Sequence, residues 1–144
     1  MATYNKFQDF SEQLTNGVQN FASDTYKVML VNSPAPVATN SVKADLTEIS
    51  AGNGYTAGGT ATTIAVSETT GTTTVTGTQV VFTASGGSIG PFRYVVLYND
   101  TTSTPVNKPL VAWWDYGSSI TLADGETFTV KFSNASPGSI FTLA

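Results

Sequence analysis

The sequence predicts a mainly β protein: an antiparallel β-sandwich or jelly-roll-like barrel, with a short amphipathic helix at its N-terminus and one short helix near 41–49. Three observations predict this class. Some eight or nine short strand-like runs follow one another, separated by turn residues. Threonine, which favours strands and supplies polarity without charge, occurs 24 times. Half of the aromatic residues lie between Gly90 and Phe132, in segments with strand periodicity.

The stretch from Gly90 to Phe132 indicates consecutive antiparallel strands. Alternation along its first run places four residues on each face, namely Phe92, Tyr94, Val96 and Tyr98 on one and Arg93, Val95, Leu97 and Asn99 on the other. A second run covers 110–116. The third has an apolar face with Phe128, Val130 and Phe132, and a polar face with Thr127, Thr129 and Lys131. Asp124-Gly125 precedes the third run and predicts a type I′ hairpin turn.

The remaining elements follow from the same local signals. Apolar residues spaced three and four apart, Phe7, Phe10 and Leu14, predict a helix over Tyr4–Asn16. Its stripe either covers an open face or end of the sandwich or forms an arm that binds a neighbouring subunit, and we favour the first because most apolar helix stripes pack within their own chain. Residues 41–49 place Val42, Leu46 and Ile49 on one side of a second short helix.

Strands are expected at several further positions. The run at 25–32 is largely apolar on both faces, which indicates a strand that is central or covered on both sides. A glycine-rich loop at 51–59 has Tyr55 at its middle, and it lacks the lysine and the strand–helix context of a phosphate-binding loop, so we expect a conformationally special loop around an anchored tyrosine. Threonine-rich strands follow at 60–67, 72–76 and 79–84, and a last strand lies at 139–143.

Composition limits the possible chemistry. A chain of 144 residues suits one domain over 1–144, with a helical segment at 1–22 and the sandwich at 23–144. It contains no cysteine and no histidine, which removes disulfides, thiolate metal sites, the commonest general base and most zinc sites. We therefore expect no enzyme activity, no cofactor and no metal site.

Charge and hydropathy also limit the partners. One arginine and five lysines are spread along a chain of net charge −4, whereas nucleic-acid binding requires clustered cations. No apolar run approaches the roughly 18 residues of a membrane span, and the first residues do not resemble a Sec-type signal peptide. We expect neither a nucleic acid nor a membrane as partner.

Two groups of residues are candidates for a functional site. Asp115, Asp124 and Glu126 are closely spaced acids, but no second motif positions them as a catalytic pair, so a structural role is favoured. Trp113 and Trp114 are adjacent and must point to opposite faces of a strand, so one is expected in the core and the other outside. The alternative is that both faces are covered.

The outward tryptophan, with Tyr116, suits either stacking on a glycan or anchoring at a protein interface. Arg93, the only arginine, is either an ion-pair member or a solvated strand residue. The candidate interface residues are Phe7, Phe10, Leu14, Tyr55, Arg93, Trp113, Trp114 and Tyr116.

Three segments carry a family resemblance: AGNGYTAGGTA, GPFRYVVLYND and PLVAWWDYGSSITLADGETFTVKF. Together with the opening NKFQDFSEQL, the whole chain resembles small structural proteins of tailed bacteriophages. The resemblance implies a virion component assembled in the host cytoplasm, and within that class a capsid decoration or cement protein that binds the outside of the head shell. The implied partners are the major capsid protein and further copies of this chain, as a dimer or trimer.

Two alternatives stay open. Tail and neck components share the size and fold type of decoration proteins. From another class, a carbohydrate-binding or receptor-binding module would use Tyr55, Trp113, Trp114 and Tyr116.

Overall fold

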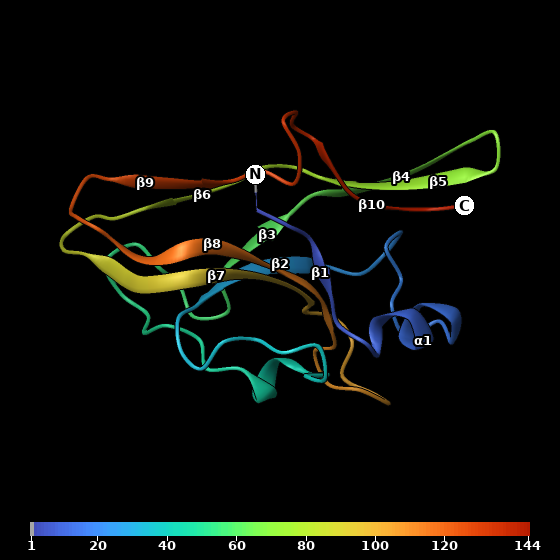
Figure 1. The fold of residues 1–144 in the computed structure, drawn as a ribbon, viewed down its shortest axis with the longest axis horizontal. Helices are drawn as coiled ribbons and strands as arrows, with labels where there is room; N and C mark the ends of the chain where they lie inside the picture. Colours follow the sequence, from blue (N-terminus) through green and yellow to red (C-terminus); the bar gives the residue numbers. More distant parts are fainter. Residues whose placement is uncertain (1) are drawn as a thin grey trace.

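The computed structural model describes residues 2–144 as two packed layers of antiparallel strands (Figure 1). The first layer is a five-stranded sheet whose strand order is β1 (Asn5–Lys6), β8 (Leu110–Leu122), β7 (Ile89–Asn99), β2 (Tyr26–Val31) and β3 (Thr60–Thr62). The mainly β, sandwich-like class expected from the sequence is therefore present.

The second layer contains two small sheets. Their orders are β10 (Gly138–Leu143), β5 (Thr72–Gly77), β4 (Ile64–Thr69), and β6 (Val80–Thr83), β9 (Thr127–Val130). Only residues 78–79 separate β5 from β6. β5 pairs with β10, and β6 pairs with β9. The layer therefore extends as one long ribbon above the five-stranded sheet (Figure 1).

One side of the sandwich is closed by the chain itself. Residues 60–69 pass from the first layer, where β3 pairs with β2, to the second layer, where β4 pairs with β5. Thr78 anchors the crossing: its carbonyl accepts the Thr62 hydroxyl at 2.7 Å and its own hydroxyl accepts the Thr63 amide at 3.0 Å. No strand makes a corresponding crossing on the opposite side, among residues 2–144, where β8 and β9 lie.

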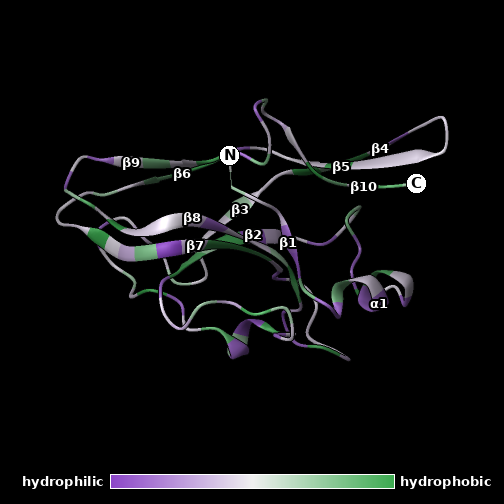
Figure 2. Cartoon of the chain, viewed as in Figure 1, coloured by the Kyte–Doolittle hydropathy of each residue, from purple (hydrophilic) through white to green (hydrophobic). Residues whose placement is uncertain are grey.

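Apolar side chains occupy both faces of the five-stranded sheet. The main cluster lies between the layers and includes Val28, Leu30, Leu97 and Val130. A smaller cluster on the other face includes Met29, Val31, Val96, Tyr98 and Leu110, all fully buried. Burial on both faces explains why β2 is largely apolar, as expected for 25–32, and Val28 to Val31 form an unbroken hydrophobic run. Figure 2 shows the hydropathy of each strand, with β7 banded in contrasting colours.

The expected alternation of β7 is interrupted. Phe92 packs between the layers with Val95 and Leu97, not on the face of Val96 and Tyr98. The pairing register of β7 and β8 shifts between Phe92 and Tyr94, and such a bulge moves the side chains before it to the other face. The face assigned to Phe92 from the sequence was therefore wrong.

The helical content is smaller than expected. The helix predicted over Tyr4–Asn16 is reduced to α1 (Phe10–Thr15), because Asn5–Lys6 forms β1 and pairs with β8. The helix predicted at 41–49 is only a 3₁₀ turn, η1 (Lys43–Asp45). The Asp45 carboxylate accepts the backbone amides of residues 41 and 42, so the short polar side chain stabilises a turn in place of a helix.

The Asp124-Gly125 turn also differs from its prediction. A type I′ turn requires positive φ at both central residues. Gly125 has φ of +87°, but the φ of Asp124 is not positive. The strands that flank the turn do not pair, because β8 belongs to the five-stranded sheet and β9 pairs with β6. The turn is therefore a connection between layers and not a hairpin.

Candidate binding site

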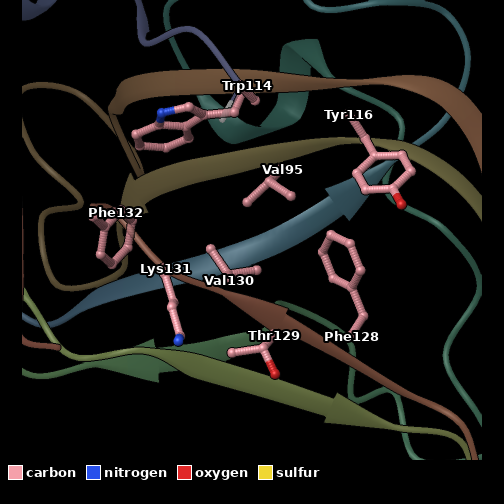
Figure 3. Close-up of a pocket in the computed structure, with 9 residues that line it drawn as sticks. Val95, Trp114, Tyr116, Phe128, Thr129, Val130, Lys131 and Phe132 are labelled. Atoms are coloured by element: carbon pink, nitrogen blue, oxygen red, sulfur yellow. The ribbon is translucent and has the colours of Figure 1, made fainter. Parts of the chain in front are cut away.

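An apolar pocket of about 160 Å³ lies where the two layers meet on the side without a strand crossing (Figure 3). We call this side the open seam and define it by residues 114–122 of β8 and 127–130 of β9. The pocket is lined by Ala2, Val95, Trp114, Tyr116, Phe128, Thr129, Val130, Lys131 and Phe132.

Two aromatic pairs flank the pocket, and each pair joins the layers. The Trp114 and Phe132 rings lie 5.5 Å apart between centroids, and the Tyr116 and Phe128 rings 5.7 Å apart at 73°. Val95 and Val130 lie between the two pairs in Figure 3. Tyr116 is 53% exposed, so this end of the pocket opens to solvent.

The N-terminal segment borders the other end. In Figure 1 the chain descends from near the second layer to β1, and Ala2 lines the pocket on this path. The Tyr4 ring contacts Trp114 edge-on, with 5.7 Å between centroids. Burial against the indole raises the pKa of Tyr4 to about 12, because its phenolate would lose hydration.

Both strands of the open seam have an unpaired edge. β1 covers the outer edge of β8 only opposite residues 112 and 113, so no strand from the described part of the chain pairs with that edge from Trp114 onward. β9 pairs with β6 and, within residues 2–144, with no other strand. Unpaired strand edges present rows of backbone donors and acceptors that another extended chain can pair with.

Lys131 supplies the one cationic side chain among the pocket-lining residues. The ion pairs within residues 2–144 are Lys27–Asp100, Lys108–Asp100, Lys43–Glu48 and Arg93–Asp115. Lys131 is exposed and has no part in them. The site therefore combines an apolar hollow, free backbone edges and a cation that takes part in none of these ion pairs, a combination that suits binding.

The two tryptophans lie on opposite faces of β8, as alternation predicts, but neither side chain emerges. Trp113 packs on Phe7 with 4.6 Å between ring centroids, while Trp114 packs under the second layer. Both are half-buried. The expectation of one exposed tryptophan was wrong, and the alternative of two covered faces applies.

Arg93 is an ion-pair member. Its guanidinium donates from Nε and a terminal nitrogen to the two carboxylate oxygens of Asp115, at 2.8 and 3.0 Å, and lies 5.4 Å from the Tyr94 ring centroid. These hydrogen bonds, followed by one from the Gly117 amide, lower the pKa of Asp115. Neither side chain of the pair lines the pocket.

Tyr55 is a buried anchor and not a surface residue. It is 2% exposed, and its hydroxyl lies between the Leu30 amide and the Glu48 carboxylate. The sequence prediction of a special loop around an anchored tyrosine was right, and its use in a binding surface is not supported by this position.

The three apolar residues of the predicted helical stripe separate in the structure. Phe7 precedes α1 and joins the cluster on the outer face of the five-stranded sheet. Phe10 is buried and Leu14 half-buried in the main cluster, where Phe10 contacts Phe21 and Phe141 edge-on. The stripe therefore packs within the chain.

The acids considered as a catalytic group each have a structural contact. Asp115 pairs with Arg93, Asp124 accepts the Gly86 amide at 2.9 Å, and Glu126 accepts the Ala123 amide at 2.8 Å. No three acidic side chains within residues 2–144 converge as a metal site would require. Across the same residues, no helix is long and apolar enough to span a membrane.

Comparisons with known proteins gave no relative: no protein-family model, no curated protein and no solved structure matches the chain.

Among the residues that line the pocket, the sequence identified only Trp114 and Tyr116 as candidate site residues. The apolar face of Phe128, Val130 and Phe132 was recognised, but its position opposite Trp114 depends on how the layers stack. The shared two-residue spacing of Trp114 and Tyr116 was the available signal, because it places both on one face of β8.

Proposed function

We propose that this chain is a structural protein of a tailed-bacteriophage virion, and specifically a decoration or cement protein that binds the outer surface of the capsid shell. Its partner is then the major capsid protein, and its location is the virion, after assembly in the host cytoplasm. The proposal rests first on the resemblance of the whole chain to small virion proteins.

The open seam is the structural observation that best supports a binding role. It offers aromatic side chains and unpaired strand edges at one place, and such features are typical of protein interfaces. The acids nearest to it are engaged in structural contacts, which favours a binding protein over an enzyme.

Oligomers and a finer fold assignment belong to the same proposal. A shell presents many copies of one protein at symmetry axes, so a dimer or trimer that matches local symmetry is expected. A jelly-roll-like connectivity and an N-terminal helix that covers the sandwich are the finer fold features that we retain as part of the proposal.

Cryo-electron microscopy of the phage that encodes the chain tests the location. The expected result is symmetric density of this size on the outer capsid surface, in a fixed ratio to the shell protein. Density confined to the tail or neck would overturn the decoration role and favour the tail or neck alternative.

A carbohydrate-binding or receptor-binding module is the second candidate, and the exposed ring of Tyr116, on the same pocket as the half-buried Trp114, favours it. A glycan array compares the wild-type chain with the Trp114→Ala variant, with circular dichroism as the check on folding. Signal above background that is lost in the variant would support this module, and a blank array would exclude it for the glycans tested.

A further inference from the structure

We infer that the open seam binds an extended segment of a partner protein by strand addition to β9, with an apolar side chain of that segment in the pocket and an acidic residue beside Lys131. The inference goes beyond the capsid proposal, because it concerns how the seam recognises a protein and applies to any partner with such a segment.

The first argument is the backbone. β9 is a regular strand with one free edge, and its partner β6 pairs with it without a register shift from Val80 opposite Val130 to Thr83 opposite Thr127. The other free edge, on β8, is distorted at this level, since Gly117 has φ of +104° and the β7–β8 register shifts nearby. An added strand therefore finds a better template on β9.

The second argument is the size of the pocket. A volume of about 160 Å³ is below the range of roughly 300–1,000 Å³ that is usual for small-molecule sites, but it suits one apolar side chain. In strand addition, pockets beside the edge accept alternate side chains and give specificity, while backbone hydrogen bonds give affinity. The aromatic pairs Trp114–Phe132 and Tyr116–Phe128 form the two ends of such a pocket.

The third argument is charge. The chain carries a net charge of −4, and most of its cations are held in ion pairs, yet Lys131, the residue directly after the edge strand β9, has no ion-pair partner within residues 2–144. A lysine at the end of an edge strand opposes pairing with arbitrary strands, because the added strand would bring its own groups against this charge without compensation. An acidic residue on the incoming strand removes this penalty, so Lys131 selects for acidic segments.

These arguments define the recognised chemistry. The segment is extended and carries one acidic residue and no other charge. The residues directly before and after the acid are apolar, and the apolar residues recur at every second position. Alternation then directs the apolar side chains into the seam and the acid outward, on the same side as Lys131.

The test uses the full chain and a synthetic probe, the acetylated and amidated hexapeptide Thr-Val-Asp-Phe-Thr-Val. Binding is followed by tryptophan fluorescence and calorimetry. We expect saturable binding to the wild-type chain and about tenfold weaker binding to Lys131→Glu, because an attractive cross-strand pair becomes repulsive. A probe with Lys in place of Asp should show the reverse preference.

Two controls separate recognition from general effects. Lys6→Glu makes the same change in net charge on an exposed residue that does not line the pocket, and it should bind the acidic probe as the wild type does. A probe methylated at alternate backbone nitrogens should not bind, because it cannot pair with the β9 edge. Circular dichroism verifies that each variant is folded.

Several results would overturn the inference: no saturable binding, equal affinity of the wild type and Lys131→Glu for both probes, or full affinity of the methylated probe. A self-associated form that ultracentrifugation detects and that the probe dissociates would assign the seam to a second copy of this chain. Glycan binding lost in Trp114→Ala would assign it to a carbohydrate.

Discussion

The Tyr55 hydroxyl donates a hydrogen bond to the Glu48 carboxylate, with 2.6 Å between Oη and Oε1. The same hydroxyl accepts the Leu30 amide at 3.0 Å, and the same carboxylate oxygen accepts the Gly58 amide at 2.6 Å. The pair therefore fastens the glycine-rich loop to β2 and to the segment before the loop. Burial and the bond to Glu48 raise the pKa of Tyr55, so the hydroxyl stays protonated as a donor.

Tyr55→Phe should lower the free energy of unfolding by about 1–3 kcal/mol, because it leaves the buried Leu30 amide without its acceptor. Urea denaturation followed by circular dichroism measures the change. Tyr116→Phe is the matched control: the Tyr116 ring is 53% exposed, so removal of its hydroxyl should change stability by less than about 0.5 kcal/mol. Equal effects of the two variants would contradict the anchoring role.

Gly59→Ala should destabilise the fold severely. Gly59 has φ of +77°, and a β-carbon there would lie 1.8 Å from the Val28 carbonyl oxygen, so the loop backbone would have to move away from β2. Gly71→Ala is the control, with φ of +84° and no atom within 4 Å of the added carbon. We expect about 1–2 kcal/mol for Gly71→Ala from backbone strain alone, and about 3 kcal/mol or more for Gly59→Ala.

Urea denaturation of both glycine variants measures the difference. A smaller loss of stability in Gly59→Ala than in Gly71→Ala would show that the loop does not approach β2 as closely as the structure indicates.

Local patterns predicted the parts of this molecule that local chemistry determines. The two-residue alternation located most strands, and the glycine cluster around Tyr55 indicated an anchored loop. The acceptor of that tyrosine, Glu48, was not predictable, because its approach depends on the 3₁₀ turn that replaced the expected helix. The pocket was not predictable either, since its two sides come from β8 and β9, which are consecutive in sequence but belong to different layers.

The bulge near Phe92 shows a further limit of alternation. One irregularity between Phe92 and Tyr94 moved Phe92 into the interlayer cluster, and nothing in the run of residues identifies the position of the irregularity. The same limit applies to predicting which strand residues are exposed for binding, because a register shift of one residue exchanges the buried and exposed side chains.

Arg93→Gln should raise the pKa of Asp115 toward its ordinary value. In the wild type, the hydrogen bonds from Arg93 and then from the Gly117 amide lower that pKa. A lowered pKa in the folded state means that Asp115 contributes stability above the unfolded-state pKa of about 3.9, and the contribution is lost as the pH falls through the folded-state value.

Carboxyl-carbon NMR titration of the wild type and Arg93→Gln measures the shift. An unchanged Asp115 titration in Arg93→Gln would show that the ion pair is not formed in solution.

Alkaline pH should unfold this protein through its buried tyrosines. Burial raises the pKa of Tyr4 from 10.0 to about 12 and raises those of Tyr26, Tyr55 and Tyr98 as well. A tyrosine whose pKa is raised by folding contributes stability that is fully present below its unfolded-state pKa of about 10. This stability is lost as the pH rises through the folded-state pKa, because the unfolded chain releases the proton at a lower pH than the folded chain does. Tyrosinate absorbance and circular dichroism, followed together above pH 10, should therefore change in one transition for these residues. Tyr4→Phe removes one such group and should make the loss of stability with pH less steep, whereas ionisation of all tyrosines near their ordinary pKa with the sheet signal intact would contradict the burial of these side chains.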